Sequence, residues 1–436
     1  MMRSAILLAL GLLSSPAIAG DLVAIRVGRA ETVANGTIEN AVILVEGSKI
    51  VTIGEDLPVE RGIPIVDRPD WVVMPGMVNA YSRMGLDSTG SSKPTPDAHA
   101  SDELYPNERV YNEVIETGVT TLGLYPPGNS IPGQAVAVRP NGATPEEMIL
   151  ADDVYLKVIL RANKTSKKQL RDGFAAADKH LEKVAKAKEK WDKEQEKKKK
   201  KKKSSKKKDD DEDDKKSEDD DKKKDDKKDE GSDVFTPPEP DAQAKVFLKL
   251  REQSLPALVS LAGAAEYLHF FDALGDEEIT WNLRLPLPTE SDLFYVLNQD
   301  DFGVRVKGIG EHEVRVVIEP RTTRHPGTMR ERNMPAELAA SGAKLVFVPL
   351  RDDLTNHKRW LADVAAVVAK GLDRETALRA LTLEPAELLG LGERLGSLEQ
   401  DKDANMVFLD GDPFESSTTI KAVMIEGDVV YGEVNP

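Results

Sequence analysis

Both ends of the chain are rich in β-forming residues, and they enclose a long central region in which short apolar runs alternate with helical patterns. Residues 21–73 contain β-rich runs separated by turn signals such as Asn35-Gly36. Residues 396–436 again have the pattern of short strands. An alternation of buried strands and helices is typical of a mostly parallel sheet covered by helices. We therefore expect an α/β centre flanked by two β-rich end segments.

Composition limits the class of protein. A chain of 436 residues, 40% of them hydrophobic, can build one large domain and a smaller one. The formal net charge of −16 argues against a partner made of nucleic acid. The chain has no cysteine, which excludes disulfides, thiolate metal ligands and a cysteine nucleophile.

The first residues have the pattern of a targeting segment. Arg3 precedes an apolar run over residues 5–13 that is too short to span a bilayer, and residues 17–19 read Ala-Ile-Ala, a small-x-small cleavage site. We predict a signal peptide over residues 1–19 and a secreted protein, periplasmic or extracellular, that begins at Gly20. The alternative is an N-terminal membrane anchor. No later apolar run is long enough to cross a membrane, so no membrane span is expected.

A charged insertion interrupts the central region. Apolar residues at helical spacing predict a helix that begins near Lys168 and contains Phe174 and Trp191. It leads into residues 197–233, which consist almost entirely of lysine, aspartate, glutamate and serine. Such a segment cannot bury apolar surface, so we predict disorder over residues 197–233. The tract is interpreted as a solvated spacer, with adhesion to an anionic surface as the alternative.

Sequence motifs then connect the chain to a known family. Residues 75–83 read PGMVNAYSR and resemble the P-G-hydrophobic-hydrophobic-D-x-H-x-H motif of the amidohydrolase superfamily, in its imidazolonepropionase-like branch. Residues 382–391, TLEPAELLGL, resemble the superfamily's T-x-N-P-A-x-x-L-G, and residues 396–413 resemble its G-S-L-x-x-G-K-x-A-D-x-x-x-x-D-x-D-P. The resemblance implies a (β/α)8 TIM-like barrel plus a small β-sandwich formed by the N- and C-terminal segments. The expected boundaries are residues 20–73 for the first part of the sandwich, 74–392 for the barrel and 393–436 for the second part.

The same resemblance implies a site for zinc or another divalent metal, held by histidines after strands 1, 5 and 6, with an aspartate after strand 8. This chain has Tyr81 and Arg83 at the strand 1 positions. Ser260 lies at the strand 5 position, in residues 255–262. Strand 6 is expected over residues 279–287, which end Arg284-Leu285-Pro286 and then Leu287, without a histidine. Tyrosine is a poor zinc ligand and a guanidinium has no lone pair to offer. We therefore predict no metal and no other cofactor.

The catalytic aspartate is also displaced. Residues 342–350 resemble the family's strand 8, G-V-x-V-A-x-G-S-D, and Leu350 falls on the aspartate position. Asp352 or Asp353 could act as the catalytic base only if the loop after this strand is longer. The six histidines do not occur as H-x-H or H-x-x-x-H pairs; they are His99, His180, His269, His312, His325 and His357. A relocated metal site built from them, or a magnesium or calcium site built from carboxylates alone, stays open as an alternative.

Three interpretations of function follow. In the first, the chain is a metal-free, degenerate amidohydrolase-like protein that binds a small, anionic ligand through Tyr81, Arg83 and Ser260, because arginine can grip a carboxylate or phosphate in a bidentate fork. Arg83 could instead be an internal ion-pair partner of Asp352 or Asp353. The second interpretation is an active hydrolase of non-peptide carbon–nitrogen bonds with displaced metal ligands. The third is a non-catalytic subunit that assembles with itself or with an intact homologue.

Overall fold

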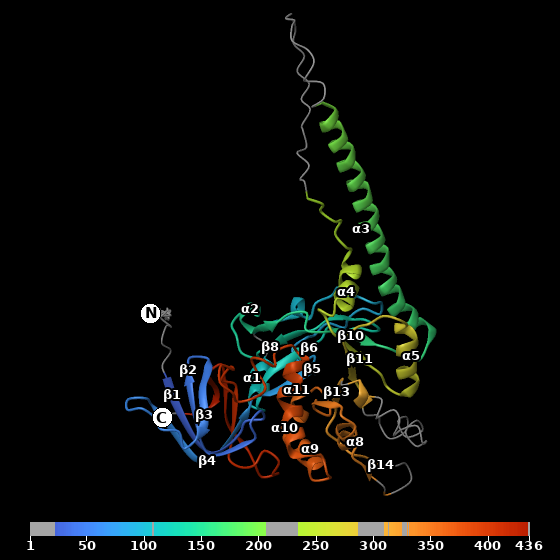
Figure 1. Cartoon of the computed structure of the whole chain (residues 1–436). Coiled ribbons are helices and arrows are strands. Elements are labelled where there is room, and N and C mark those ends of the chain that lie inside the picture. The colour runs from blue at the N-terminus through green and yellow to red at the C-terminus, as the bar shows by residue number, and fades with distance from the viewer. Residues whose placement is uncertain are drawn as a thin grey trace, which may run out of the picture.

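The computed structural model describes residues 22–106, 109–205, 234–286, 309–312, 314–324, 329 and 331–434. The predicted signal peptide, His325 and residues 206–233 of the charged tract lie outside these ranges. Three parts are visible in Figure 1: a β-rich part that contains both ends of the described chain, a central α/β part, and a long helix, α3, that projects from the centre.

The β-rich part is one seven-stranded sheet built from both ends of the chain. Its strands are β1 (Leu22–Glu31), β2 (Thr37–Glu46), β3 (Lys49–Glu55), β4 (Ile65–Pro75), β17 (Met406–Leu409), β18 (Ile420–Ile425) and β19 (Asp428–Gly432). Their order in the sheet is β19-β18-β17-β4-β1-β2-β3, and β17 runs antiparallel to β4 with Phe408 opposite Val73. The two ends of the chain therefore pair as expected. The hydrogen bonding is continuous over the seven strands, and a single core cluster includes Ile43 from β2 and Met424 from β18. The predicted β-sandwich stays a prediction.

The centre contains two sheets. In the first, β5 (Met77–Ser82) is parallel to β6 (Val119–Leu124) and continues into the antiparallel strands β8 (Val136–Val138) and β9 (Ile149–Ala151). The second sheet has the order β16-β13-β12-β11-β10-β7. Its parallel strands are β10 (Leu156–Ile159), β11 (Ala257–Ser260), β12 (Trp281–Arg284), β13 (Arg315–Ile318) and β16 (Lys344–Phe347), and β7 (Gly133–Gln134) is antiparallel at the edge. A hairpin of β14 (Thr323–Arg324) and β15 (Glu331–Arg332) completes the strands of the described residues.

Helices cover one face of these strands. They are α1 (Arg109–Ile115), α2 (Pro145–Met148), α3 (Lys164–Ser205), α4 (Ala242–Arg251), α5 (Ala264–Leu274), α8 (Met334–Ala340), α9 (Leu354–Val368), α10 (Arg374–Leu381) and α11 (Leu383–Leu388), with a 3-10 helix, η1, at Ala100–Glu103. Val316 packs with the helices in the largest core cluster, whereas its neighbour Val317 faces the other way. Val317 shares a separate cluster with Ala80 of β5 and Val346 of β16. Because this cluster contains residues of both sheets, the two sheets enclose a common apolar layer.

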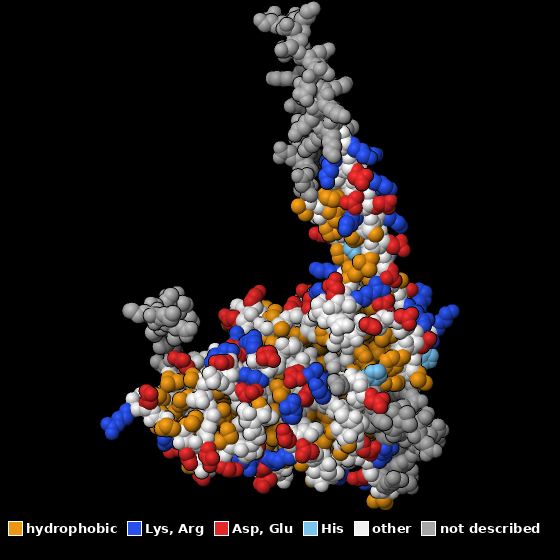
Figure 2. Space-filling model, in the orientation of Figure 1, with side chains coloured by type: hydrophobic (Ala, Val, Ile, Leu, Met, Phe, Trp, Pro, Cys, Tyr) orange, Lys and Arg blue, Asp and Glu red, His pale blue; other side chains and the backbone are white. Residues whose placement is uncertain are grey.

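The projecting helix has 42 residues, which corresponds to about 60 Å at 1.5 Å per residue. Near the body it packs closely: Phe174 is buried, and a side chain at Gly173 would collide with the ring of Phe247 on α4. Beyond His180 the helix is mostly exposed and carries alternating acidic and basic side chains (Figure 2). It continues to Ser205, through residues 197–205 where disorder was predicted, because a lysine run is still a good helix former. Among the helices of the described residues, none is both long and apolar enough to cross a bilayer.

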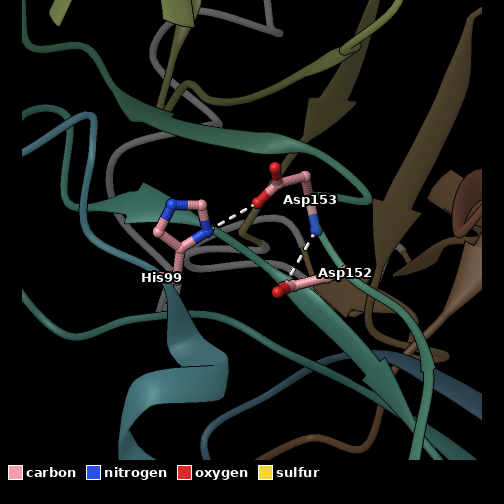
Figure 3. A group of neighbouring side chains, drawn as sticks. All are labelled: His99, Asp152 and Asp153. Carbon is pink, nitrogen blue, oxygen red and sulfur yellow. Dashed lines mark hydrogen bonds and ion pairs between the residues drawn. The ribbon is translucent and has the colours of Figure 1, made fainter. Parts of the chain in front are cut away.

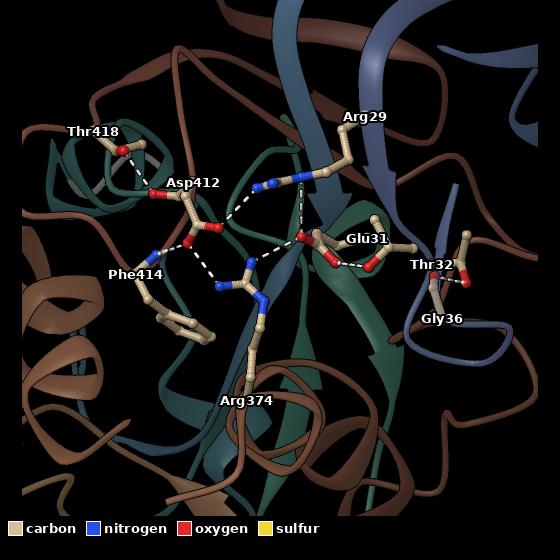
Figure 4. A network of polar contacts seen from close by, with 9 residues as sticks. Arg29, Glu31, Thr32, Gly36, Arg374, Asp412, Phe414 and Thr418 are labelled. Atoms are coloured by element: carbon tan, nitrogen blue, oxygen red, sulfur yellow. Dashed lines mark hydrogen bonds and ion pairs between the residues drawn. The ribbon is translucent and has the colours of Figure 1, made fainter. Parts of the chain in front are cut away.

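A network of ion pairs connects the end sheet to the centre (Figure 4). Arg374, the first residue of α10, contacts Glu31 of β1 and Asp412 of the segment after β17, both at 2.8 Å. Arg29 contacts the same two carboxylates, at 3.2 Å to Glu31 and 2.9 Å to Asp412. Glu31 is only 3% exposed, so the two arginines stabilise a carboxylate that has lost most of its water. The network therefore fixes the position of the end sheet against α10.

Candidate functional site

The strand register places several polar side chains on the face that carries the shared apolar layer. In parallel pairs, Lys157 is aligned with Leu258, Ser260 with Arg284, and Arg284 with Val317. Aligned residues of neighbouring strands point to the same face, and Leu258 and Val317 belong to the shared layer. Lys157, Ser260 and Arg284 therefore point into the same interior. Ser260 and Arg284 end their strands, so they lie at the carboxyl edge of the sheet.

Lys157 is a buried cation surrounded by aromatic rings. It is 3% exposed, and its Nζ donates a hydrogen bond of 2.5 Å to Tyr81 Oη. The same atom lies 3.2 Å from the ring centroid of Tyr125 and 4.2 Å from that of Tyr81. The two tyrosine rings stack on each other with centroids 4.2 Å apart. None of the ion pairs among the described residues includes Lys157, so aromatic rings and one hydroxyl replace the usual carboxylate partner.

Burial and charge change the pKa values of this pair. Burial lowers the pKa of Lys157 to about 8, although Tyr81 opposes the shift. Burial by itself would raise the pKa of Tyr81, but the positive charges of Lys157 and Arg284 outweigh it and bring that pKa down to about 8. Tyr125 has no such compensation, so burial raises its pKa. Lys157 and Tyr81 thus hold their protons with similar strength.

Arg284 occupies the end of β12, where the family has a histidine after strand 6. Its side chain donates to the carbonyl oxygens of Leu285 and Val317, each at 3.1 Å, and forms a buried ion pair with Glu319. Its guanidinium carbon lies 5.1 Å from the ring centroid of Tyr81. The charge of Arg284 is therefore compensated by Glu319, unlike that of Lys157.

The two predicted aspartates have different roles. Asp352 lies at the end of β5, where its carboxylate accepts hydrogen bonds from Ser82 Oγ at 2.7 Å and from the backbone N–H of Arg83 at 2.5 Å. Burial raises the pKa of Asp352, and these two hydrogen bonds oppose the shift. Asp353 instead caps α9 and accepts from the backbone N–H of Asn356 at 2.9 Å. Asp352 therefore belongs to the site, and Asp353 is a structural residue.

The side chain of Arg83 forms no ion pair with Asp352 or Asp353, the two partners that the sequence offered. Asp352 accepts from its backbone, and its Nη2 donates to the carbonyl oxygen of Ser88 at 2.8 Å. The Nε of Arg83 and the Oγ of Ser260 are buried atoms that have no hydrogen-bond partner among the described residues. Such atoms are costly unless something else binds them. Two of the three predicted ligand-binding residues thus keep unused hydrogen-bonding capacity.

His357 contributes to the support of β5. Its Nδ1 donates to the carbonyl oxygen of Asp353 at 2.9 Å, so its Nε2 is the acceptor for Asn79 Nδ2 at 3.0 Å. Burial lowers the pKa of His357, which keeps the ring neutral. Asn79 in turn accepts from the backbone N–H of Tyr81 at 3.2 Å. His357 is therefore a structural residue that orients the strand carrying Tyr81.

Another histidine lies in a group with the composition of a metal site. His99, Asp152 and Asp153 hold one ligand atom each within 4.8 Å of one another (Figure 3). His99 Nδ1 is 2.6 Å from Asp153, whose second oxygen is 2.8 Å from Lys249 Nζ, and Ser101 donates to Asp152 at 2.9 Å. Asp153 precedes β10, at the amino end of that strand. The negative charge of this group is thus already offset by Lys249. The group also lies away from the carboxyl ends of the strands, where Ser260 and Arg284 are found.

The structure brings together Tyr81, Arg83, Ser260 and Asp352, four of the five residues selected from the sequence. It adds Lys157, Arg284 and Glu319. A signal for Lys157 was present, since residues 155–160 read YLKVIL, a single lysine in an apolar run of strand length. The other histidines of the described residues lie elsewhere: His180 on α3, His269 on α5, and His312 stacked on Phe271 with ring centroids 5.5 Å apart.

Comparisons with known proteins agree with this architecture. A model of the amidohydrolase family matches residues 359–431. Imidazolonepropionase from Thermoplasma volcanium is 39% identical over 72 residues, which are 15% of this chain and 18% of that protein. The chain thus spans less than a fifth of the curated relative that it matches.

Solved structures extend the similarity to almost the whole chain. An amidohydrolase from Thermotoga maritima MSB8 superposes with a TM-score of 0.71 at 19% identity, covering 94% of this chain and all of that one. A prolidase complexed with N-methylphosphonate-L-proline superposes with a TM-score of 0.51 at 13% identity, covering 94% of this chain and all of that one. The fold is therefore that of a mixed α/β protein of the TIM-barrel class with an added β-rich part. Together with the matched segment, this fold agrees with the resemblance to the amidohydrolase superfamily that the motifs indicate.

Proposed function

We propose that this chain is a metal-free member of the superfamily that binds a small carboxylate or phosphate in the interior between β5, β10, β11 and β12. The observation that carries the proposal is Lys157, a buried ammonium whose partners are aromatic rings and a phenol. A buried cation without a carboxylate is stabilised when an anion binds beside it. An anionic ligand would supply the missing charge.

The atoms around Lys157 support an anion rather than a metal ion. The positions of the family's metal ligands hold Tyr81, Arg83, Ser260 and Arg284, which include two permanent cations. A divalent metal placed among Lys157, Arg83 and Arg284 would be repelled by Lys157 and Arg83, whereas Glu319 already compensates the charge of Arg284. An anion would be attracted by the same charges and could accept hydrogen bonds from Arg83 Nε and Ser260 Oγ, both of which have no partner in the described part of the chain.

We also propose that the two central sheets close into a (β/α)8 barrel. Contacts between their edges support this closure. Asp352, which follows β16, accepts from Ser82 of β5 at 2.7 Å, and Tyr155, which precedes β10, donates to the carbonyl oxygen of Ala80 at 3.1 Å. Closure would place the anion site inside the mouth of the barrel, where enzymes of this class bind their ligands.

Anion binding can be tested by thermal stabilisation. Acetate and inorganic phosphate, added at millimolar concentration at constant ionic strength, are expected to raise Tm of the purified chain by mass action. The change Lys157→Met should abolish the shift, and Arg83→Met should reduce it. Lys344→Met is the matched control, because Lys344 is an exposed lysine on β16. The proposal is wrong if neither anion raises Tm, or if Lys157→Met leaves the shift unchanged.

The alternative of an active hydrolase predicts a bound metal. In the described part of the chain, the group with suitable ligands is His99, Asp152 and Asp153, which is held by Lys249 and Ser101. Elemental analysis of the dialysed protein separates the two functions. We expect less than about 0.1 equivalent of zinc, manganese, iron or nickel per chain, whereas a displaced catalytic site should retain close to one equivalent.

A further inference from the structure

The nitrogen of Lys157 and the phenol oxygen of Tyr81 form an isolated donor–acceptor pair. They are 2.5 Å apart, and the ring of Tyr125 lies against the Lys157 nitrogen. Lys157 is buried, while its neighbours Tyr81, Arg83 and Ser260 are of intermediate exposure. In other buried ion pairs of this chain, such as Arg284 with Glu319, a carboxylate holds the cation in its charged form. The Tyr81 phenol does so only in part, because it opposes the fall in the pKa of Lys157 without cancelling it.

Proton transfer from Lys157 to Tyr81 can convert the Lys157 ammonium into a neutral amine. The pKa values of Lys157 and Tyr81 are both lowered to about 8, Lys157 by burial and Tyr81 by the neighbouring cations that overcome burial. Because the two values are similar, the ammonium can transfer a proton to a phenolate at little energetic cost. A neutral, desolvated amine is the nucleophilic form of lysine. The geometry and the proton balance therefore both favour reactivity over a purely structural role.

We propose that Lys157 is a nucleophile that forms a Schiff base with the carbonyl group of a small 2-oxo carboxylate whose carboxylate is bound by Arg83. The inference rests on the proposed function for the anion, and adds covalent chemistry to it. Arg83 and Tyr81, the partner of Lys157, lie two residues apart at the end of β5, and the positive charge of Arg83 is among the smaller causes that lower the pKa of Lys157. A 2-oxo carboxylate carries its carbonyl next to its carboxylate, so one ligand can satisfy Arg83 and meet Lys157.

The chemical step needs no oxidant or metal. The amine nitrogen of Lys157 attacks the carbonyl carbon, and the Tyr81 hydroxyl gives a proton to the carbonyl oxygen, which yields a carbinolamine. The carbon–oxygen bond then breaks and the oxygen leaves as water, carrying in total two of the three protons of the original ammonium. The third proton stays on the nitrogen of the C=N bond, so the positive charge is retained on the iminium. Ser260 Oγ is available to hydrogen-bond the carboxylate beside Arg83.

Reductive trapping tests the step on the full-length chain. Glyoxylate is added at pH 8 with sodium cyanoborohydride, and peptides are mapped by mass spectrometry for a carboxymethyl group on lysine. Trapping at Lys157 is expected to be at least about tenfold faster than at the exposed Lys344 in the same digest. Tyr81→Phe should slow the trapping at Lys157 without affecting Lys344, while a melting curve shows that the variant is folded. Trapping at Lys157 that is no faster than at Lys344 overturns the proposal.

An uncharged aldehyde separates the two parts of the argument. Arg83→Met should slow trapping of glyoxylate but leave trapping of acetaldehyde unchanged, because acetaldehyde has no carboxylate. If both aldehydes react equally in the unmodified chain and in Arg83→Met, a 2-oxo carboxylate is not the ligand. If glyoxylate raises Tm but never modifies Lys157, the nucleophile is refuted and the proposed anion binding stands. If acetate, phosphate and glyoxylate all leave Tm unchanged while Lys157 is trapped rapidly, the nucleophile stands and the anion site is refuted.

Discussion

Replacement of Lys157 by methionine should make the protein more stable, and the gain should disappear at high pH. Methionine has a similar length and no charge, so it fills the same space between Tyr81 and Tyr125. The folded-state pKa of Lys157 is about 8, against an ordinary value of 10.5. At 1.36 kcal/mol per unit, the charged lysine costs the folded state about 3 kcal/mol at pH 7. Loss of the cation–π contacts offsets about 1 kcal/mol, which leaves an expected gain of about 2 kcal/mol.

The sign of the pH dependence follows from proton binding. Between pH 8 and pH 10.5 the unfolded chain keeps the lysine proton while the folded chain has released it. The unfolded state therefore binds more protons, and the free energy of unfolding of the unmodified chain rises with pH over this window. Lys157→Met lacks this contribution and also removes a cation that lowers the pKa of Tyr81, so the stability difference between variant and unmodified chain should fall by at least about 3 kcal/mol from pH 7 to pH 10.5.

Urea denaturation of both proteins at four pH values measures this difference, because the titration of every distant group cancels. The measurement also needs equal m-values, which show that the same surface is exposed on unfolding. Lys344→Met serves as the control, and its stability difference should be small and independent of pH. A difference for Lys157→Met that stays constant with pH, or a variant that is less stable at pH 7, would refute the assignment of Lys157 as a buried, poorly compensated cation.

Two further predictions concern the joints of the fold. Arg374→Met should lower the free energy of unfolding by about 1–3 kcal/mol, because the buried Glu31 loses one of its two arginines. Calorimetry or urea titration measures this loss. The control Lys358→Met, on the exposed side of α9, should have little effect. Gly173→Ala should destabilise the chain by about 1–3 kcal/mol, because the added methyl group would meet the ring of Phe247, even though alanine is the better helix former. A lower Tm and faster proteolysis within α3 are the expected results. A rise in Tm would contradict this packing.

Motifs at the ends of strands predicted much of the fold and part of the site. The first motif ends at Tyr81 and Arg83, and the strand 5 resemblance placed Ser260 correctly, because local sequence determines where a buried strand stops. Asp352 was selected only on the condition of a longer loop; it lies between β16 and α9, and its role as a catalytic base stays a prediction. The capping role of Asp353 has a local signal as well, since aspartate is a preferred residue before the first turn of a helix, where its carboxylate accepts from the backbone N–H of Asn356, three residues on.

The rest of the site depends on contacts that sequence spacing does not contain. Lys157 and Tyr81 are 76 positions apart, and Arg284 and Glu319 are 35 apart. The single lysine in the apolar run of residues 155–160 indicates an unusual residue but not its partner, and β10 is too short to give a periodic pattern of its own. Arg284 was seen only as the absence of a histidine. Arg284 is the second cation near Tyr81, after Lys157, and the pairing of β11 with β12 places it there.

The pairing of β4 with β17 has a consequence for synthesis of the chain. Val72 of β4 pairs with Leu409 of β17, so more than 300 residues must be made before this edge of the sheet is complete. At about 5–20 residues per second, the exposed strand waits roughly 20 seconds to one minute on the ribosome or beyond it. An unpaired, largely apolar strand is a template for wrong association during that time. We therefore expect either that a chaperone shields β4 during synthesis, or that the sheet folds only after both ends of the chain have been made.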